Sequence, residues 1–441
     1  MKKLITSAGF AVLGAASLNA QQIYAPAPGL TTTQLSKPWS VSAAIRGFYD
    51  DNYALTPSKG IVLPNGTKVK PQDSYGYEVT PSVGLNWTME QTYLGLGYVY
   101  SLKYFENRVS DKYDQSHQAN LKLSHAFTDR YKLDLTDSFV LTREPDLIAP
   151  SNAANATIRS RQDVLRNYGA ASFTAGLSDR FSAVLGYSNT LYDFRDDGAG
   201  SLSALLDRME HLISANLRYQ VQPSTVALIG YQYGIMDFTG DENTLIFIDP
   251  NNPGRGTLQS DDRSNHSHYV YVGVDHNFNP QLDGSVRIGA QFTTYDNLPT
   301  GDDNNVSPYA DANLTYRMTP DSAVQVGIRH SRIATDAAAL DQENTTIYGS
   351  VSYRVLPPLT ASLLSQFQFN DFGEGRTAAG VSPVSFKDKG ENFWLVGLNL
   401  TYEINRFLAA EAGYNYDRLD SDIGFRSFTR NRVYVGLRAS Y

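Results

Sequence analysis

The sequence predicts an all-β protein whose strands close into an antiparallel, up-and-down transmembrane β-barrel. Three observations predict this fold: an export signal, repeated segments of about ten residues in which apolar and polar residues alternate, and connections that are alternately short and long. A strand places successive side chains on opposite faces, so this alternation predicts a sheet with one apolar and one wet face. Such segments are long enough for a tilted strand to cross a bilayer.

The first residues, "MKKLITSAGFAVLGAASLNA", have the pattern of a secretory signal peptide. Lys2 and Lys3 precede an apolar stretch, and small residues lead to a predicted cleavage site after Ala20. We therefore expect residues 1–20 to be removed on export, residues 21–38 to form a short periplasmic segment, and residues 39–441 to form the barrel.

Composition narrows the class of protein further. The chain of 441 residues has no Cys, which excludes disulfides and thiolate metal sites, and its 29 Tyr and 20 Phe against 5 Met favour strands. After the signal segment no run of apolar residues is long enough for a transmembrane helix. The net charge of -8 argues against nucleic-acid binding, which needs a basic surface.

The last segment, "RNRVYVGLRASY", shows the alternation clearly. One face carries Val433, Val435, Leu437, Ala439 and Tyr441, and the opposite face carries Arg430, Arg432 and Arg438. In a closed barrel lipid covers the apolar face and water contacts the polar one. Elsewhere Asp137 and Asn189 interrupt the apolar face, so we expect a bulge or register shift there.

Eight short turns, including "FTDRY", "FNPQL" and "INRF", alternate with long connections rich in Gly, Asn, Asp and Pro. Eight hairpins and one strand at each end predict 18 strands, with 16 as an alternative. The predicted strands are residues 40–53, 74–86, 91–105, 115–127, 131–142, 167–177, 181–192, 208–219, 225–236, 265–278, 282–295, 305–318, 322–331, 344–355, 359–369, 391–404, 407–418 and 429–441. An aromatic girdle is predicted beside the short turns, at Trp87, Phe127, Tyr131, Phe181, Phe278, Phe407 and Tyr441.

These features together resemble a Gram-negative outer-membrane β-barrel of the putative porin type. The resemblance rests on the signal peptide, the short inner turns and a final strand, "VYVGLRASY", that ends on an aromatic residue. It implies a passive channel for small hydrophilic solutes. It also implies that Tyr441, where Phe is commoner, is part of the signal that the barrel assembly machinery reads.

A barrel of 16 to 18 strands leaves an aqueous channel, so side chains on the polar face are candidates to line it. By alternation the pore-lining candidates are Arg46, Glu78, Lys103, Lys122, Lys132, Arg218, Arg287, Arg317, Arg329, Arg354, Arg432 and Arg438. Basic rings favour anions, so we expect a mild anion preference, with an unselective solvated wall as the alternative.

The outer loops add further expectations. Loops 143–163 and 237–263 are long enough to fold inward, and Arg159, Arg161 and Arg166 are candidates for a constriction. The loops are acidic, so they could bind divalent cations that bridge lipopolysaccharide phosphates, or could simply be solvated. The acidic stretches 193–198 and 301–305 suggest calcium as an alternative to plain turns; no other cofactor is expected.

Two other functions are consistent with a barrel. A structural or surface-interaction barrel, such as an adhesin or glycan-export component, would use its loops and have a closed lumen. A rim enzyme would need a histidine base, and His266 and His268 lie two residues apart, but no nucleophile motif accompanies them. We therefore expect a channel and no enzyme, in contact with outer-membrane lipid and lipopolysaccharide, and leave the oligomeric state open.

Overall fold

The computed structural model describes residues 38–441, apart from 63–67, 144–162, 196–200, 241–242, 246–256, 298–303, 320, 338, 373–388 and 424–425. Eighteen long strands form one sheet. They are β1 (Trp39–Asp50), β4 (Ser74–Thr88), β5 (Thr92–Phe105), β6 (Tyr113–Ala126), β7 (Tyr131–Thr142), β8 (Val164–Gly176), β9 (Phe181–Phe194), β10 (Arg208–Gln222), β11 (Thr225–Phe238), β14 (Asn265–Asn279), β15 (Leu282–Tyr295), β16 (Asn304–Thr319), β17 (Ser322–Ile333), β18 (Gln342–Leu356), β19 (Leu359–Phe372), β20 (Gly390–Asn405), β21 (Leu408–Ser421) and β22 (Phe428–Ser440).

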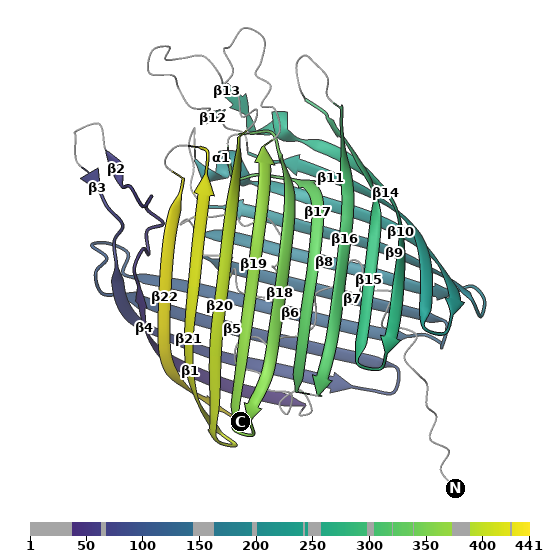
Figure 1. The fold of residues 1–441 in the computed structure, drawn as a ribbon, viewed down its shortest axis with the longest axis horizontal. Helices are drawn as coiled ribbons and strands as arrows, with labels where there is room; N and C mark the ends of the chain where they lie inside the picture. Colours follow the sequence, from purple (N-terminus) through teal and green to yellow (C-terminus); the bar gives the residue numbers. More distant parts are fainter. Residues whose placement is uncertain are drawn as a thin grey trace.

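The sheet closes on itself. Each long strand pairs antiparallel with its sequence neighbours, and β1 pairs with both β4 and β22, which joins the first strand to the last. The front wall, β14 to β22, crosses the back wall, β4 to β10, as expected for tilted strands on opposite sides of a barrel (Figure 1). Closure leaves no unpaired edge, which is what a sheet in lipid requires. The predicted barrel of 18 strands is therefore confirmed.

The connections differ at the two ends of the barrel. Short turns and Tyr441 lie along one end, and the longer connections lie at the other (Figure 1). The longer connections carry small elements: β2 (Ile61–Val62) paired with β3 (Lys68–Val69), β12 (Asn243–Leu245) paired with β13 (Thr257–Gln259), helix α1 (Leu202–Leu206) and a 3-10 helix, η4 (Ser260–Arg263). At the short-turn end the Tyr441 ring lies 5.3 Å from that of Trp39 and 6.1 Å from that of Phe407.

The two faces of the wall have opposite polarity. In β1, Val41, Ile45 and Tyr49 are exposed, whereas Ser42 and Arg46 between them are buried. The same alternation exposes large apolar residues on the outside of the other long strands, and the predicted girdle residues are all exposed at the short-turn end. The hydrophobic effect therefore favours lipid around the outside of this wall.

The expected bulges at Asp137 and Asn189 were wrong. Both residues lie in uninterrupted register, and the shifts occur instead beside short turns, for example between Gln220 and Gln222. The outward polar groups are satisfied sideways, because Asn167 Nδ2 donates to Asp137 Oδ2 at 3.2 Å and Asn189 Nδ2 donates to a backbone carbonyl at 3.2 Å. Local hydrogen bonding thus replaces a change of register.

Within the described part of the chain no helix is long and apolar enough to cross a membrane. The predicted signal peptide and most of the predicted segment 21–38 lie outside the described residues. Both therefore stay predictions.

Candidate functional site

The candidate site is the inner face of the barrel wall. Strand register places all twelve predicted pore-lining residues on this face, opposite the exposed apolar set: Arg46, Glu78, Lys103, Lys122, Lys132, Arg218, Arg287, Arg317, Arg329, Arg354, Arg432 and Arg438. Their position follows from alternation alone. Whether solutes pass along them stays a prediction.

Buried charges join the strands where the barrel closes. Glu411 of β21 contacts Arg46 of β1 at 2.7 Å and Arg438 of β22 at 3.1 Å, and Arg46 also lies 3.7 Å from Glu78 of β4. One carboxylate therefore bridges two arginines across the seam between the first and last strands. Because the Glu411 side chain is 5% exposed, these attractions are weakly screened by solvent.

A second bridge of the same kind lies on the other side of the barrel. Asp275 of β14 contacts Arg218 of β10 at 2.9 Å and Arg287 of β15 at 2.6 Å, and all three side chains are almost fully buried. A buried carboxylate between two guanidinium groups makes charge-assisted hydrogen bonds to both. The interior at this level is thus lined by compensated charges.

Most of the other predicted bases are also paired. Arg432 contacts Asp417 at 2.6 Å, Arg329 contacts Asp311 at 2.9 Å and Lys132 contacts Asp134 at 2.9 Å. Arg354 contacts Asp321 at 2.8 Å, and Arg317 contacts Asp283. The predicted site residues omitted the partners Asp50, Asp275 and Asp417; Asp50 contacts Arg430. The inward parity of these acids was the signal that could have found them.

Several interior tyrosines lie flat against the wall. The Tyr271 ring covers Gly230 on the neighbouring strand, where an added Cβ would come within 2.3 Å of it, and Tyr434 covers Gly413 at the same distance. Tyr271 donates to Asn216 Oδ1 at 2.6 Å, and Tyr434 donates to Asn399 Oδ1 at 2.6 Å. Glycine at these close approaches lets each ring stay against the wall, out of the lumen.

The outer end of the interior is occupied by the connection between β17 and β18, residues 334–341. Thr335 and Ala339 are at most 1% exposed, and Ala337 and Ala339 pack on Phe372 of the inner wall. Arg332 lies just before this segment and reaches the interior residues Ser307 at 2.9 Å and Asp341 at 2.7 Å. The segment therefore folds into the outer mouth. Its signal in the sequence is the run of small residues in "ATDAAALD", which lets the chain pack in a narrow space.

Two arginines hold this segment from opposite sides. Arg263 of η4 is fully buried, donates to the carbonyl of Thr335 at 2.7 Å, and also donates to the carbonyl of Leu205 in α1. Arg426, just before β22, contacts Asp336 at 2.6 Å and Glu391 at 3.2 Å. Four of the outer connections thus meet at segment 334–341.

The two arginines differ electrostatically. Burial lowers the pKa of the Arg263 guanidinium to about 9, and the nearby Arg208 adds to this, whereas Asp341 and Asp336 oppose it. Burial alone would also lower the pKa of Arg426, but Asp336 and Glu391 outweigh it and raise that pKa above its usual range. Arg426 is therefore held by carboxylates, whereas Arg263 is held by uncharged carbonyl groups.

An apolar cluster lines another part of the outer interior. Leu55, from the connection after β1, packs over the cluster formed by Leu364, Phe393, Leu395, Leu419 and Phe428. These five residues are buried on inward positions of neighbouring strands. The wet face expected from alternation therefore does not reach the outer end on this side, because a loop covers an apolar wall there.

The predicted constriction is only partly described. Arg159 and Arg161 lie outside the described residues, and Arg166 faces inward from β8. Loop 143–163 therefore stays a prediction, as does most of loop 237–263, whose end at Arg263 does reach the interior. The described inward segment, 334–341, was missed because it is shorter than the loops that length alone singled out.

All seven histidines of the chain lie on outward positions of strands: His117, His125, His211, His266, His268, His276 and His330. His266 contacts Asp296 at 2.8 Å, an acidic partner that the sequence did not indicate. Among the described residues no three His, Cys, Asp or Glu gather closely enough to hold a metal ion. Parts of the two predicted calcium stretches lie outside the described residues, so calcium stays a prediction.

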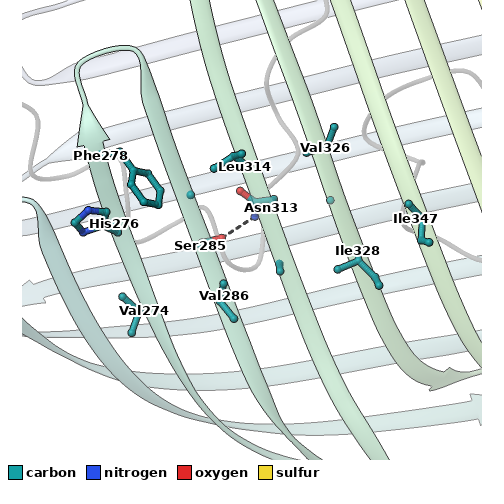
Figure 2. A pocket seen from close by; sticks show the side chains of 13 residues that line it. Val274, His276, Phe278, Ser285, Val286, Asn313, Leu314, Val326, Ile328 and Ile347 are labelled. Atoms are coloured by element: carbon teal, nitrogen blue, oxygen red, sulfur yellow. Dashed lines mark hydrogen bonds between the residues drawn. The ribbon is translucent and has the colours of Figure 1, made fainter.

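A groove of about 590 Å³ lies on the outer face of the wall (Figure 2). It crosses β14 to β18, and its walls include His276, Val286, Leu314 and Ile328. Gly284 and Ala312 line it where neighbouring strands carry larger residues. Because these positions are on the apolar face, the groove opens toward lipid and is separate from the channel interior.

Comparison with known proteins adds a family to this geometry. The family described as putative beta-barrel porin 2 matches residues 259–355 and 344–441, which span the last nine long strands. No curated protein matches the chain.

Solved structures with a similar fold include three outer-membrane proteins. OccAB4 from Acinetobacter baumannii has a TM-score of 0.41 and 13% identity over 92% of this chain and 99% of that chain. OpdQ from Pseudomonas aeruginosa has a TM-score of 0.41 and 13% identity, with the same coverage of both chains. A BenF-like porin from Pseudomonas fluorescens has a TM-score of 0.42 and 10% identity, again over 92% and 99%.

The closed barrel, its apolar outer face and the family match converge on one assignment. They confirm the resemblance on which the fold was predicted, and they place the chain in the outer membrane. The chain is a Gram-negative outer-membrane β-barrel protein of the putative porin type.

Proposed function

We propose that the protein is a porin-like channel for passive diffusion of small hydrophilic solutes. The observation that carries this proposal is the closed sheet of 18 strands with an ion-paired, polar inner wall. A barrel of this strand number is wide enough to leave an aqueous path, whereas one of about eight is filled by its own side chains.

The outer mouth supports a limit on solute size. Segment 334–341 occupies part of it, and Arg263 and Arg426 tie that segment to other outer connections. A mouth narrowed by packed backbone admits small solutes and excludes large ones. Size selection would therefore occur at the outer end, and charge selection would occur along the wall.

We also propose a mild preference for anions. Basic side chains predominate among the inward charges, but contacts such as Arg218–Asp275–Arg287 neutralise much of their field. Lys103 and Lys122 face inward on adjacent strands, so they are the best positions to test. The preference is expected to be weak because most of the arginines are paired.

The test is single-channel current from the refolded mature chain, from Gln21 on, in a planar bilayer under a salt gradient. Stable steps with a reversal potential on the anion side are expected. The pair Lys103→Glu and Lys122→Glu should move that potential toward cations, and Lys112→Glu, in an outer loop, is the matched control. Unitary current with cation preference in the parent chain would remove the anion proposal and leave the channel.

A closed structural or surface-interaction barrel is the second candidate. The buried packing of segment 334–341 favours it, because four outer connections meet there. In that case a correctly folded, heat-modifiable barrel would pass no current. Replacement of loop 237–263 by a short turn would then leave the conductance at zero, whereas in a channel it would change the conductance.

Tyr441 is proposed to take part in recognition by the barrel assembly machinery. In support of this proposal, its backbone pairs with that of Val41 through bonds of 2.9 and 3.3 Å, and its ring contacts Trp39 beside the closing seam. Tyr441→Phe should keep normal outer-membrane yield, and Tyr441→Ser should lower it. Equal yields would contradict this role.

A further inference from the structure

We propose that the groove beside His276 binds one phospholipid of the periplasmic leaflet, with the phosphate at the His276 ring and an acyl chain along the groove. The site lies on the outer face of the wall and is independent of solute passage. Four observations carry the proposal: the position of His276, the hydrogen bonds that orient its ring, the course of the groove, and a second copy of the same side-chain arrangement that lacks the groove residue.

His276 is at the membrane–water boundary. It lies on the outer face of β14, close to the short turn, and next to the exposed girdle residue Phe278. The two rings meet edge to face, with centroids 4.5 Å apart. Aromatic girdles mark the level of lipid headgroups, so a donor on this ring is at the height where lipid phosphates lie.

The ring of His276 is oriented by a short chain of hydrogen bonds. Gln222 Nε2 donates to Thr225 Oγ1 at 2.7 Å, and Thr225 Oγ1 lies 2.8 Å from His276 Nδ1. Because the threonine oxygen already accepts from Gln222, its own hydrogen is free to go to Nδ1. A ring that accepts at Nδ1 carries its hydrogen on Nε2 in the neutral form. Nε2 is then a donor suited to a phosphate oxygen.

The groove begins beside this ring and rises into the apolar band. One row of paired residues along it is Val274, Val286, Ala312, Ile328 and Ile347. Val274 lies five positions before the short-turn end of β14 at Asn279, and Ile347 lies nine positions before that of β18 at Leu356. Five strands at a spacing of about 4.8 Å span roughly 19 Å. The groove thus leads an acyl chain from the boundary toward the membrane centre, as a periplasmic-leaflet lipid requires.

A second histidine shows what the groove adds. His125 has the same surroundings as His276: Thr92 Oγ1 lies 2.7 Å from its Nδ1, and the Phe127 ring meets it edge to face at 4.5 Å. The register partner of His276 on the next strand is Gly284, but the partner of His125 is Leu133. An added Cβ at Gly284 would lie 3.0 Å from Leu314 Cδ1, inside the groove. Leucine at the equivalent position covers that space beside His125.

The experiment is native mass spectrometry of the delipidated full-length mature barrel in detergent. The probes are phosphatidic acid and a diacylglycerol with identical chains, which lacks the phosphate. One phosphatidic acid should bind above the background. His276→Phe should weaken this binding about ten-fold, the effect of losing one hydrogen bond to a charged group, and His276→Gln, which keeps a donor, should restore part of it. His125→Phe is the matched control and should change nothing.

The groove is tested by exchanging the two partner residues. Gly284→Leu should abolish the bound phosphatidic acid, and Leu133→Gly should create a second bound lipid beside His125. Heat-modifiable migration shows that each variant is folded before it is measured; if His276→Phe fails that check, the leucine–glycine exchange decides alone. Equal binding of diacylglycerol would overturn phosphate recognition, and equal losses from His276→Phe and His125→Phe would overturn the groove as its cause.

Discussion

The closing seam and the outer mouth of the barrel are both held by buried arginines, but they are built in different ways. At the seam, Arg46 and Arg438 share Glu411, and all three residues lie on paired strands. At the mouth, Arg263 donates to carbonyl groups of α1 and of segment 334–341, which come from different outer connections. Charge pairing thus locks strands together, whereas hydrogen bonding to backbone locks loops together.

This difference separates stability from gating. The seam contacts hold the strand pairing that closes the barrel, so their loss should be felt by the whole fold. The mouth contacts hold a segment that the strand hydrogen bonds do not need. Weakening them should therefore change what passes through the barrel more than whether it folds.

The largest expected effect is at the seam. Glu411→Ala leaves Arg46 and Arg438 without their shared carboxylate, and breaking a buried pair in this way costs about 3–5 kcal/mol. The free energy of unfolding, measured by urea titration of the refolded barrel in micelles, should fall by that amount. Glu403→Ala is the control, because that side chain is 40% exposed and 3.7 Å from Arg354. Equal changes in the two variants would mean that burial does not set the strength of the seam.

The next effect is at the mouth. Arg263→Ala removes the donor from two or more buried carbonyl groups, each worth about 1.5–3 kcal/mol when the donor is charged. Segment 334–341 should then leave the outer mouth, and the single-channel conductance should rise while the barrel stays folded.

Arg418→Ala is the matched control for the mouth, since Arg418 is an exposed outer-end arginine that contacts Asp420 at 3.3 Å. Its conductance should equal that of the parent chain. An unchanged conductance in Arg263→Ala would show that segment 334–341 does not restrict the path, and would shift the constriction to another part of the lumen.

A smaller effect is expected on the wall between these regions. Gly413→Ala places a Cβ 2.3 Å from the Tyr434 ring, which must move off the wall into the lumen. Overpacking of this kind costs about 1–3 kcal/mol, and the displaced ring should lower the conductance. Gly97→Ala is the control, because an added Cβ there meets nothing within 4 Å. If both variants conduct equally, flat tyrosines do not keep the lumen open.

The same contrast explains how far the sequence could predict the molecule. Alternation follows from backbone geometry, so it placed residues such as Arg218 and Arg438 on the inner face correctly. It could not pair Arg218 with Asp275, because they are 57 residues apart and meet only through the order of the strands. Segment 334–341 was beyond it for another reason: what folds a loop inward is the space left by other loops, and no local pattern records that space.

The smallest expected effect is at the periplasmic mouth, where ion pairs resemble those of the seam but face water. Arg354 contacts Asp321 at 2.8 Å, with side chains 39% and 42% exposed. Exposed pairs contribute about 0–1 kcal/mol, since solvent screens the attraction and both side chains lose freedom. Arg354→Ala should therefore unfold within about 1 kcal/mol of the parent chain. A loss as large as that of Glu411→Ala would show that the seam owes its strength to arginine–carboxylate contacts in general, and not to their removal from water.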